Sequence, residues 1–276
     1  MSDRVGILGG TGGMGTLFSR VFEEAGWAVS VRGRTGSEPM ASFLTRQDVV
    51  VVSVPIEVTL GVIAQVAPHL RPDQLLCDLT SLKVGPVAEM SRSSAPAVGL
   101  HPMFGPGVAS LTGQTIVVTP ATATKEQCAP LFTLLREAGA RLTFSTPDHH
   151  DRMMAVVQGL AHSLTLVMAE TMRRLDCDLN EVLSFTSPVY RIELGLVGRL
   201  LAQDPALYRE MLRSNPHVLP VLEVCSEALE DLRDTVADPG PVAFSRLFEE
   251  NAAVFADYAP VATAETDRLI RCLVER

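Results

Sequence analysis

The chain has 276 residues, of which 47% are hydrophobic and 20% are charged, and its formal net charge is −9 at pH 7. This length allows one large or two modest globular domains, and the negative charge argues against nucleic acid or an anionic membrane as the main partner. The five cysteines form no CxxC pair, which argues against a metal site or a disulfide framework and is typical of a reducing cytosol. Because there is no uninterrupted apolar run of about 18 residues and no signal-peptide pattern, we expect a cytoplasmic protein.

The first half of the chain alternates short apolar runs with helical patterns. The run DVVVVSV, at residues 48–54, is too uniformly apolar to have one face in water, which is typical of a buried parallel strand. The alternation predicts right-handed βαβ units and an α/β, Rossmann-type, doubly wound parallel sheet. The predicted strands are residues 4–9, 27–31, 48–54, 74–78, 97–100, 114–119 and 141–145.

After about Pro147 the strand patterns disappear and long helical patterns continue to the C-terminus. We therefore predict two domains, a dinucleotide-binding Rossmann domain over residues 1–147 and an all-helical domain over residues 148–276.

A glycine-rich turn with the pattern G-x-G-x-x-G lies between the first predicted strand and the first predicted helix. Glycines there let a pyrophosphate approach the backbone, and the N-terminus of the helix favours an anion. The alternative is an ordinary glycine-rich turn. The predicted cofactor residues in this turn are Gly10, Thr11, Gly12, Gly13, Met14 and Gly15.

The end of the second predicted strand lacks the acid that binds the ribose of NAD in many such domains. Arg32, Arg34 and Thr35 occupy this stretch, and no acid comes before Glu38. An arginine can pair with a 2′-phosphate, which favours NADP over NAD. Alternatively, both arginines are solvated beside a permissive NAD site.

The third predicted strand ends in a segment that we expect to border the nicotinamide, because ligands lie at the carboxyl ends of parallel strands. These residues are Ser53, Val54 and Pro55.

The stretch GLHPMFGP, at residues 99–106, places a histidine between a glycine and a proline. Glycine and proline punctuate turns, so we predict a stiff loop. The histidine, His101, is then well placed to exchange a proton. The alternative is a turn histidine that bonds only to nearby backbone.

Five stretches together resemble one family. GGTGGMG, SVPIEVT, DLTSLK, GLHPMFGP and SPVYRIELGLVGRLLAQDP, in this order, resemble the TyrA-type prephenate dehydrogenases. The resemblance runs over nearly the whole chain and is strongest to the dehydrogenase part of the enteric bifunctional chorismate mutase/prephenate dehydrogenases. Because the first predicted strand begins at about Arg4, we expect a free-standing dehydrogenase. The family also implies a homodimer built on the helical domain.

The resemblance implies roles for five residues. His101 would accept the proton of the substrate's C4 hydroxyl, and Ser81 would contact both the histidine and that hydroxyl. Arg191 would bind a carboxylate of the dicarboxylate substrate, for which an arginine fork is suited. Gln158 and His162 lie at positions i and i+4 of a predicted helix and would line the active site. Alternatives remain for three of them: a helix N-cap for Ser81, a structural salt bridge for Arg191 and a buried, hydrogen-bonded histidine for His162.

Three further positions are less defined. Lys83 is as well explained by a solvated lysine as by a site residue. The pair His149-His150 follows Pro147 and is expected to mark an exposed start of a helix. In the enteric relatives the residue that matches Gly107 is acidic, so Gly107 could alter the choice of substrate.

The resemblance implies oxidative decarboxylation of prephenate by NADP or NAD, with hydride transfer from C4 and aromatisation of the ring. The same reaction on 4-amino-4-deoxyprephenate, in antibiotic biosynthesis, or on arogenate is the alternative. A neutral amine is needed for the amino substrate, and the lost acid at Gly107 agrees with this. A non-catalytic NADP-sensing protein is disfavoured because it would not need Ser81, His101 and Arg191 together. An imine or β-hydroxyacid reductase would lack HPMFGP.

Overall fold

The computed structural model of the protein describes residues 3–36 and 38–275. Chain contacts divide it into two compact units, which we describe separately. Unit 1 holds residues 3–155 together with Arg209–Pro216, and unit 2 holds Val156–Tyr208 and the residues from His217 onward. The predicted domain boundary after Pro147 remains a prediction.

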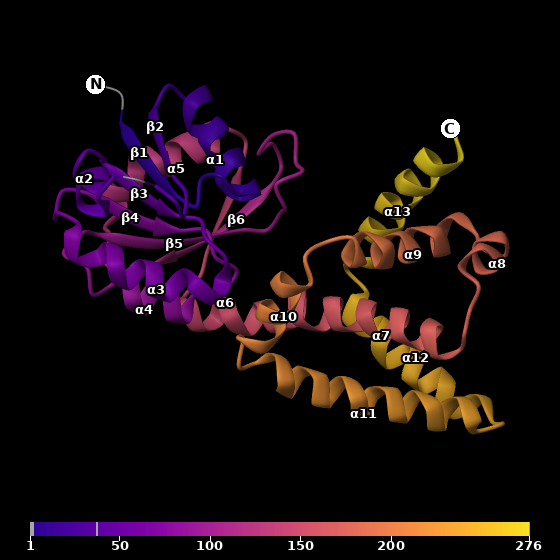
Figure 1. Ribbon diagram of the computed structural model, residues 1–276. Helices are drawn as coiled ribbons and strands as arrows, with labels where there is room; N and C mark the ends of the chain where they lie inside the picture. Colours follow the sequence, from indigo (N-terminus) through magenta and orange to yellow (C-terminus); the bar gives the residue numbers. More distant parts are fainter. Residues whose placement is uncertain (1–2, 37, 276) are drawn as a thin grey trace. The chain divides into compact units, whose positions relative to one another are not determined.

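Unit 1 is built on a seven-stranded sheet with the order β2-β1-β3-β4-β5-β6-β7 (Figure 1). Each predicted strand is present within two residues of its expected ends. The strands are β1 (Arg4–Leu8), β2 (Ala28–Arg32), β3 (Val49–Val52), β4 (Leu75–Asp78), β5 (Ala97–Pro102), β6 (Thr115–Pro120) and β7 (Arg141–Phe144).

Both faces of the sheet are covered, as the uniformly apolar strands predict. Alternate residues of β3 enter two different cores: Val49 and Val51 enter one, Val50 and Val52 the other. Helices α1 and α5 complete the first core, and α2, α3 and α4 complete the second. These helices are α1 (Gly13–Glu24), α2 (Met40–Thr45), α3 (Ile56–Val66), α4 (Val84–Met90) and α5 (Lys125–Glu137).

The sheet departs from the predicted all-parallel arrangement at one place. β6 pairs with β5 antiparallel, with His101 opposite Val117, whereas the other strand pairs are parallel. Two consecutive parallel strands need a long crossover connection, usually a helix. The connection between β5 and β6, residues 103–114, contains no helix, so β6 runs antiparallel to β5. The strand order reverses between β1 and β3, and at such a point an open α/β sheet binds its ligand beyond the carboxyl ends of its strands.

A long helical segment starts at α6 (Pro147–Met154), passes through a π-helical turn at Ala155–Leu160 and continues as α7 (Ala161–Arg174). The remaining helices are α8 (Leu179–Ser184), α9 (Pro188–Leu201), α10 (Pro205–Arg213), α11 (Val218–Ala237), α12 (Pro241–Phe255) and α13 (Ala259–Val274). Within unit 2, α9 packs against α7 and α13, and α11 packs against α12. The all-helical C-terminal part is confirmed.

By length and composition, Pro147–Arg174 could cross a membrane: its most apolar window has a mean hydropathy of 1.3, and 17% of that window is buried in the chain. The core helices of soluble proteins also pass this test of length and composition. The exposed apolar surface of this segment is therefore a candidate contact surface for a partner.

Candidate active site

The turn between β1 and α1 forms the predicted glycine cradle. Thr11, Gly12 and Gly13 are exposed, Met14 is half-buried, and Gly13 begins the helix. A Cβ on Gly15 would lie 2.4 Å from the Cα of Gly10, so only glycine lets the helix approach the strand this closely. The exposed backbone at the N-terminus of α1 can accept a pyrophosphate.

The loop that follows His101 contacts this cradle. A Cβ on Gly13 would lie only 2.8 Å from Cγ of Pro106, which belongs to the HPMFGP segment. The fold of unit 1 thus brings the two most distinctive motifs of the sequence side by side.

The loop after β2 is organised by ion pairs and hydrogen bonds of its own. Arg32 donates from Nη1 to the backbone carbonyl of Glu38 at 2.5 Å, and the Glu38 carboxylate is paired with Arg46. Arg34 and Thr35 are exposed, and in the described residues Arg34 makes no hydrogen bond or ion pair. The acid that comes first after β2 is therefore engaged, and Arg34 is the available cation.

The segment after β3 lies beside the glycine turn. Ser53 donates its backbone N–H to the last residue of β1 at 2.8 Å. Gly9 has a φ of +80°, and a Cβ there would lie 2.1 Å from the carbonyl oxygen of Ser53. The Thr59 hydroxyl donates to the carbonyl of Pro55 at 3.0 Å, while Ser53 and Val54 are half-buried. This places the predicted nicotinamide-side residues at the point where the strand order reverses.

His101 lies on a strand, not in the predicted loop. The strand predicted at residues 97–100 is present and continues through His101 and Pro102 as β5, so the loop prediction for residues 99–106 holds only for residues 103–106. Within the strand, Gly99 is required because a Cβ would lie 2.3 Å from the Oγ1 of Thr119 on β6. A side chain on a central strand is held more rigidly than one on a loop.

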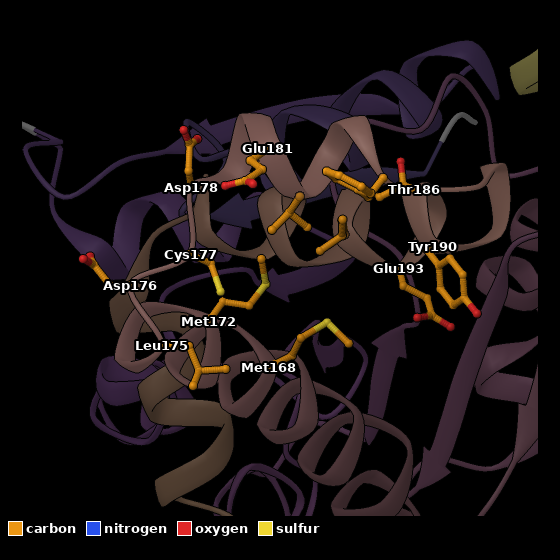
Figure 2. A pocket seen from close by; sticks show the side chains of 13 residues that line it. Met168, Met172, Leu175, Asp176, Cys177, Asp178, Glu181, Thr186, Tyr190 and Glu193 are labelled. Atoms are coloured by element: carbon orange, nitrogen blue, oxygen red, sulfur yellow. The ribbon is translucent and has the colours of Figure 1, made fainter.

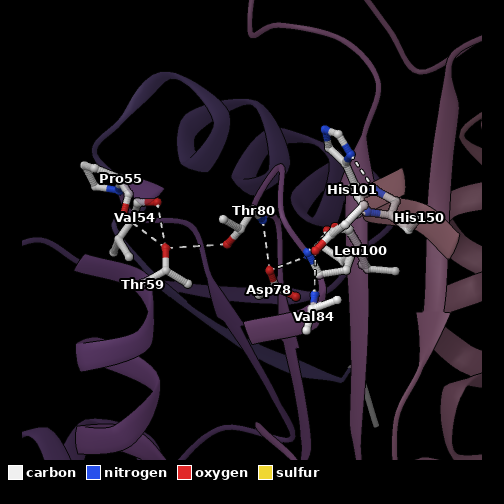
Figure 3. Close-up of polar contacts among 11 residues, drawn as sticks. Val54, Pro55, Thr59, Asp78, Thr80, Val84, Leu100, His101 and His150 are labelled. Atoms are coloured by element: carbon white, nitrogen blue, oxygen red, sulfur yellow. Dashed lines mark hydrogen bonds and ion pairs between the residues drawn. The ribbon is translucent and has the colours of Figure 1, made fainter. Parts of the chain in front are cut away.

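A chain of buried hydrogen bonds leads away from His101 (Figure 3). Nδ1 of His101 lies 2.8 Å from Nε2 of His150, and Nδ1 of His150 lies 2.7 Å from Oδ1 of Asp151. Both His150 and Asp151 are on α6. The expectation that His149-His150 marks an exposed helix start holds for His149 and is wrong for His150, because α6 turns the two side chains to different faces.

Asp151 is anchored from several directions. Its Oδ1 accepts the backbone N–H of Lys83 at 2.8 Å, and its Oδ2 accepts that of Val84 at 3.0 Å. Although burial opposes ionisation, hydrogen bonds from His150 and from these two N–H groups lower the pKa of Asp151 below its ordinary 3.8. The Asn215 amide also donates to the backbone carbonyl of Asp151 at 2.7 Å.

Lys83 is fully buried, so the expectation of a solvated lysine is wrong. Its ammonium is paired with Asp78 at the end of β4 and donates to the carbonyl of Leu100 at 2.8 Å. Burial lowers the pKa of Lys83, and the Asp78 carboxylate opposes this shift. The side chain of Lys83 joins β4 to β5, and the backbone N–H of this residue bonds to Asp151 on α6.

The environment of His101 favours its neutral form. Burial first, and then the neighbouring His150 ring and the Lys83 ammonium, lower the pKa of His101 well below the ordinary 6.5. A neutral imidazole at neutral pH is the form that can accept a proton.

Two other predicted residues lie near the carboxyl edge of the sheet. Ser81 is half-buried between β4 and α4, and within the described part of the chain its hydroxyl makes no hydrogen bond. The ring of His101 is bonded by His150, a partner that the sequence analysis did not name. Gly107 is exposed, and a Cβ there would meet no atom within 4 Å, so a larger side chain would fit.

The remaining predicted residues belong to unit 2. Arg191 is exposed in the first turn of α9, and Gln158 is half-buried in the π-helical turn. The ring of His162 meets the ring of Tyr208 edge-on, with centroids 4.9 Å apart, and burial lowers the pKa of His162. His162 is half-buried, and the alternative of a buried, hydrogen-bonded histidine stays a prediction.

Unit 2 also carries an apolar groove of about 760 Å³ (Figure 2). Met168 and Met172 of α7 lie along it, as do Phe185 and Tyr190 near the start of α9. The Phe185 side chain is 83% exposed. A groove this apolar on an isolated chain needs cover, because large exposed apolar patches mark interaction surfaces.

Sequence reasoning missed His150, Asp151 and the burial of Lys83. One signal was available: His150, Asp151 and Met154 share a helical face, and a charged pair on an otherwise apolar face indicates a buried polar network. The partner, His101, is 49 residues away in sequence, and pattern analysis does not reveal such a contact.

Comparison with known proteins agrees with this architecture. The model described as "Prephenate dehydrogenase, nucleotide-binding domain" matches residues 29–144, and "Prephenate dehydrogenase, dimerization domain" matches residues 146–250. The chain belongs to the prephenate dehydrogenase family. The T-protein of Haemophilus influenzae is 32% identical over 97% of this chain and 71% of its own length. The predicted family resemblance is confirmed.

The names of other relatives in the prephenate dehydrogenase family give different substrates. A probable arogenate/prephenate dehydrogenase of Methanocaldococcus jannaschii is 31% identical over 98% of this chain, which spans 65% of that protein. A 4-amino-4-deoxyprephenate dehydrogenase of Streptomyces pristinaespiralis is 28% identical over 95% of this chain and 93% of its own. The crystal structure of an A. aeolicus prephenate dehydrogenase with hydroxyphenyl propionate and NAD+ has a TM-score of 0.73 at 18% identity, covering 96% of this chain and 99% of that one, and shows the shared fold.

Proposed function

We propose that the protein catalyses the oxidative decarboxylation of prephenate to 4-hydroxyphenylpyruvate. A bound NAD(P)+ would take the hydride from C4. The C4 hydroxyl would give its proton to the chain, the bond between C1 and the carboxylate would break, and its electron pair would complete the aromatic ring as CO2 leaves. The resulting phenolate would then take one proton back to give the 4-hydroxyl group of the product. Aromatisation drives the reaction, so the chain has to orient the substrate and accept one proton.

His101 is the proposed proton acceptor. The observation that carries this proposal is its place at the carboxyl end of β5, in the motif whose Pro106 contacts the glycine cradle at Gly13. Cofactor and base would then serve one reacting carbon. Burial keeps the imidazole neutral, which is the state that a general base requires.

Substrate binding is assigned to polar residues by family resemblance. Arg191, exposed on α9, would bind a carboxylate through its guanidinium fork. Ser81 would position the C4 hydroxyl, and Gln158 and His162 would contact the rest of the substrate. The half-buried hydroxyl of Ser81 is compatible with this role because it lies just beyond the carboxyl end of β4.

For the cofactor we propose NADP in preference to NAD. The cradle fits a dinucleotide, since Thr11 to Gly13 leave exposed backbone at the N-terminus of α1. Glu38, the acid that could bind a free ribose diol, is paired with Arg46. Arg34 presents an exposed guanidinium, and a 2′-phosphate would bind it.

The test follows absorbance at 340 nm with purified protein, offering NAD+ and NADP+ with prephenate, arogenate and 4-amino-4-deoxyprephenate in parallel. We expect the fastest reduction with prephenate and NADP+. His101→Asn should retain cofactor binding and lose roughly 10²–10⁴-fold in kcat. Normal turnover by this variant, or no reduction with prephenate, would overturn the proposal.

A second candidate substrate is 4-amino-4-deoxyprephenate, favoured by the lack of a carboxylate at position 107, which is a glycine here. Its amine has to be neutral to release electrons into the ring, and a nearby carboxylate would stabilise the ammonium form. The relative from Streptomyces pristinaespiralis carries this substrate in its name. If Gly107 decides the substrate, Gly107→Glu would shift the ratio of kcat/KM toward prephenate.

We further propose a cytoplasmic homodimer in which a second copy covers the apolar groove and the exposed face of α7. The matched dimerization domain includes both surfaces. Light scattering of the purified chain should give twice the monomer mass, and Phe185→Asp should weaken the association. A monomer at micromolar concentration, or binding of the intact chain to lipid vesicles, would contradict this assignment.

A further inference from the structure

The hydrogen-bond chain behind His101 does more than fill the interior. We infer that His150 and Asp151 are positioning residues that hold His101 as the Nδ1–H tautomer and thereby place its basic lone pair on Nε2. The inference rests on the proposed role of His101 as proton acceptor, and it adds two residues to which no role has been assigned.

The three side chains are isolated from water. His101, His150 and Asp151 are 2%, 1% and 3% exposed. The two imidazole rings meet edge-on, with centroids 5.0 Å apart and planes at 69°. This geometry aims Nδ1 of His101 at Nε2 of His150 across 2.8 Å, a full hydrogen bond.

The direction of the protons follows from the anionic end of the chain. The Asp151 carboxylate accepts backbone N–H groups from Lys83 and Val84, which stabilise its ionised form. An ionised carboxylate accepts hydrogen bonds and donates none. Nδ1 of His150, at 2.7 Å from Oδ1, must therefore carry a proton.

The second link follows from the first. The inference assigns one N–H to each ring of this buried pair, and Nδ1 of His150 already carries the proton that its bond to Asp151 needs. A neutral imidazole has one N–H, so Nε2 of His150 is an acceptor. Nδ1 of His101 must then be the donor, which leaves Nε2 of His101 as its proton-accepting nitrogen.

The chain of bonds also explains why His150 and Asp151 act only through His101. Both ring nitrogens of His150 are engaged, one by His101 and one by Asp151. Asp151 is fixed by its own bonds to α4 and by the Asn215 amide on its backbone carbonyl. If Asp151 served only to cap the N-terminus of α4, it would not need a neighbouring histidine whose other nitrogen bonds to His101. In serine proteases an aspartate fixes the tautomer of the catalytic histidine in a comparable way.

The first test needs no substrate. The 15N NMR spectrum of protein labelled at its six histidines reports which ring nitrogen carries the proton, with His101→Asn and His150→Gln used for assignment. At neutral pH we expect protonated Nδ1 and unprotonated Nε2 for both His101 and His150. A proton on Nε2 of His101, or a cationic His150, would overturn the inference even if the proposed substrate is correct.

The second test compares His150→Gln with His150→Leu. The glutamine carboxamide oxygen can accept from Nδ1 of His101, and the leucine side chain cannot. We expect His150→Leu to lose on the order of 10²-fold in kcat at nearly constant KM, and His150→Gln to recover most of it. His149→Gln, an exposed neighbour on the same helix, is the matched control. Equal losses in Gln and Leu variants, or losses confined to KM, would reduce His150 to a packing residue.

The two tests separate the two proposals. If wild-type protein does not reduce NADP+ with prephenate, the proposed function fails while the tautomer measurement still stands. If turnover is present and both His150 variants keep the wild-type kcat, the positioning role fails alone.

Discussion

Pro106 lies against Gly13, so the loop that follows the candidate base forms one wall of the glycine cradle. A methyl group at Gly13 would approach Cγ of Pro106 to 2.8 Å and displace either the loop or the start of α1. We therefore expect Gly13→Ala to raise the Kd for the cofactor and to lower kcat together. Isothermal titration and steady-state kinetics measure the two effects.

The contact itself can be isolated by a double-mutant cycle. Pro106→Ala removes the obstructing Cγ, so Gly13→Ala should cost less in that background than in the wild type. Additive losses would show that Gly13 acts without Pro106. Gly61→Ala is the control for a glycine without such a contact, because no atom lies within 4 Å of the new methyl group in the exposed middle of α3. This variant should stabilise the fold by about 0.5–1 kcal/mol.

Replacing Lys83 by methionine should unfold the protein more easily. The Asp78 carboxylate would remain buried with its countercharge removed, and breaking one side of such a pair costs about 3–5 kcal/mol. Urea denaturation measures the loss. The double variant Lys83→Met/Asp78→Asn should regain part of it, and Lys125→Met, at an exposed lysine, should change little. A single variant as stable as wild type would contradict the importance of the pair.

Arg34→Ala should separate the two cofactors. Since charge-assisted hydrogen bonds are worth about 1.5–3 kcal/mol, the Kd for NADP+ should rise by roughly tenfold or more and that for NAD+ should stay nearly constant. Arg32→Ala should weaken both, because Arg32 holds the carbonyl of Glu38 and thereby the loop. Equal effects of Arg34→Ala on the two cofactors would leave Arg34 as a solvated side chain.

Arg191→Gln should raise KM by roughly tenfold to a hundredfold, because a carboxylate of the substrate would lose a charge-assisted pair. Steady-state kinetics at saturating cofactor give this value. Arg199→Gln, an exposed arginine in the last turn of the same helix, is the matched control. If both variants keep the wild-type KM, the substrate carboxylate is bound elsewhere.

The lowered pKa of His101 predicts a loss of stability on mild acidification. The unfolded chain takes up a proton near pH 6.5 and the folded chain does so only at much lower pH. The unfolded state therefore binds more protons as the pH falls below 6.5, and the free energy of unfolding decreases through that window. Urea denaturation from about pH 7 to 5 should show this slope, and His101→Asn should flatten it. His149→Gln is the control and should show the same slope as the wild type. A flat profile in the wild type would contradict the prediction.

Much of the sheet could be predicted because each strand carries its own signal. The four valines of β3 are buried on both faces, and the glycines after β1 permit the turn that a dinucleotide needs. Both features depend on neighbours within a few residues along the chain. Such local signals are what a sequence expresses directly.

The errors arose where distant contacts decide the outcome. His101 and Pro102 read as a loop, yet β5 continues through both. Gly99 makes room for Thr119 on the antiparallel neighbour, and the proline ends the strand. Lys83 and His150 read as exposed because charged and polar side chains usually are. Asp78, which neutralises Lys83, ends β4, and His101, which bonds to His150, lies on β5.

The segment Arg209–Pro216 belongs to unit 1, although the chain on both sides of it belongs to unit 2. The polypeptide consequently passes from one unit to the other three times, and no single cut separates the nucleotide-binding part from the helical part. A fragment that ends at Ala155 would lose Asn215, which donates to the backbone of Asp151. Exchange of this domain between relatives, by recombination or by design, has to carry the distant eight-residue segment with it.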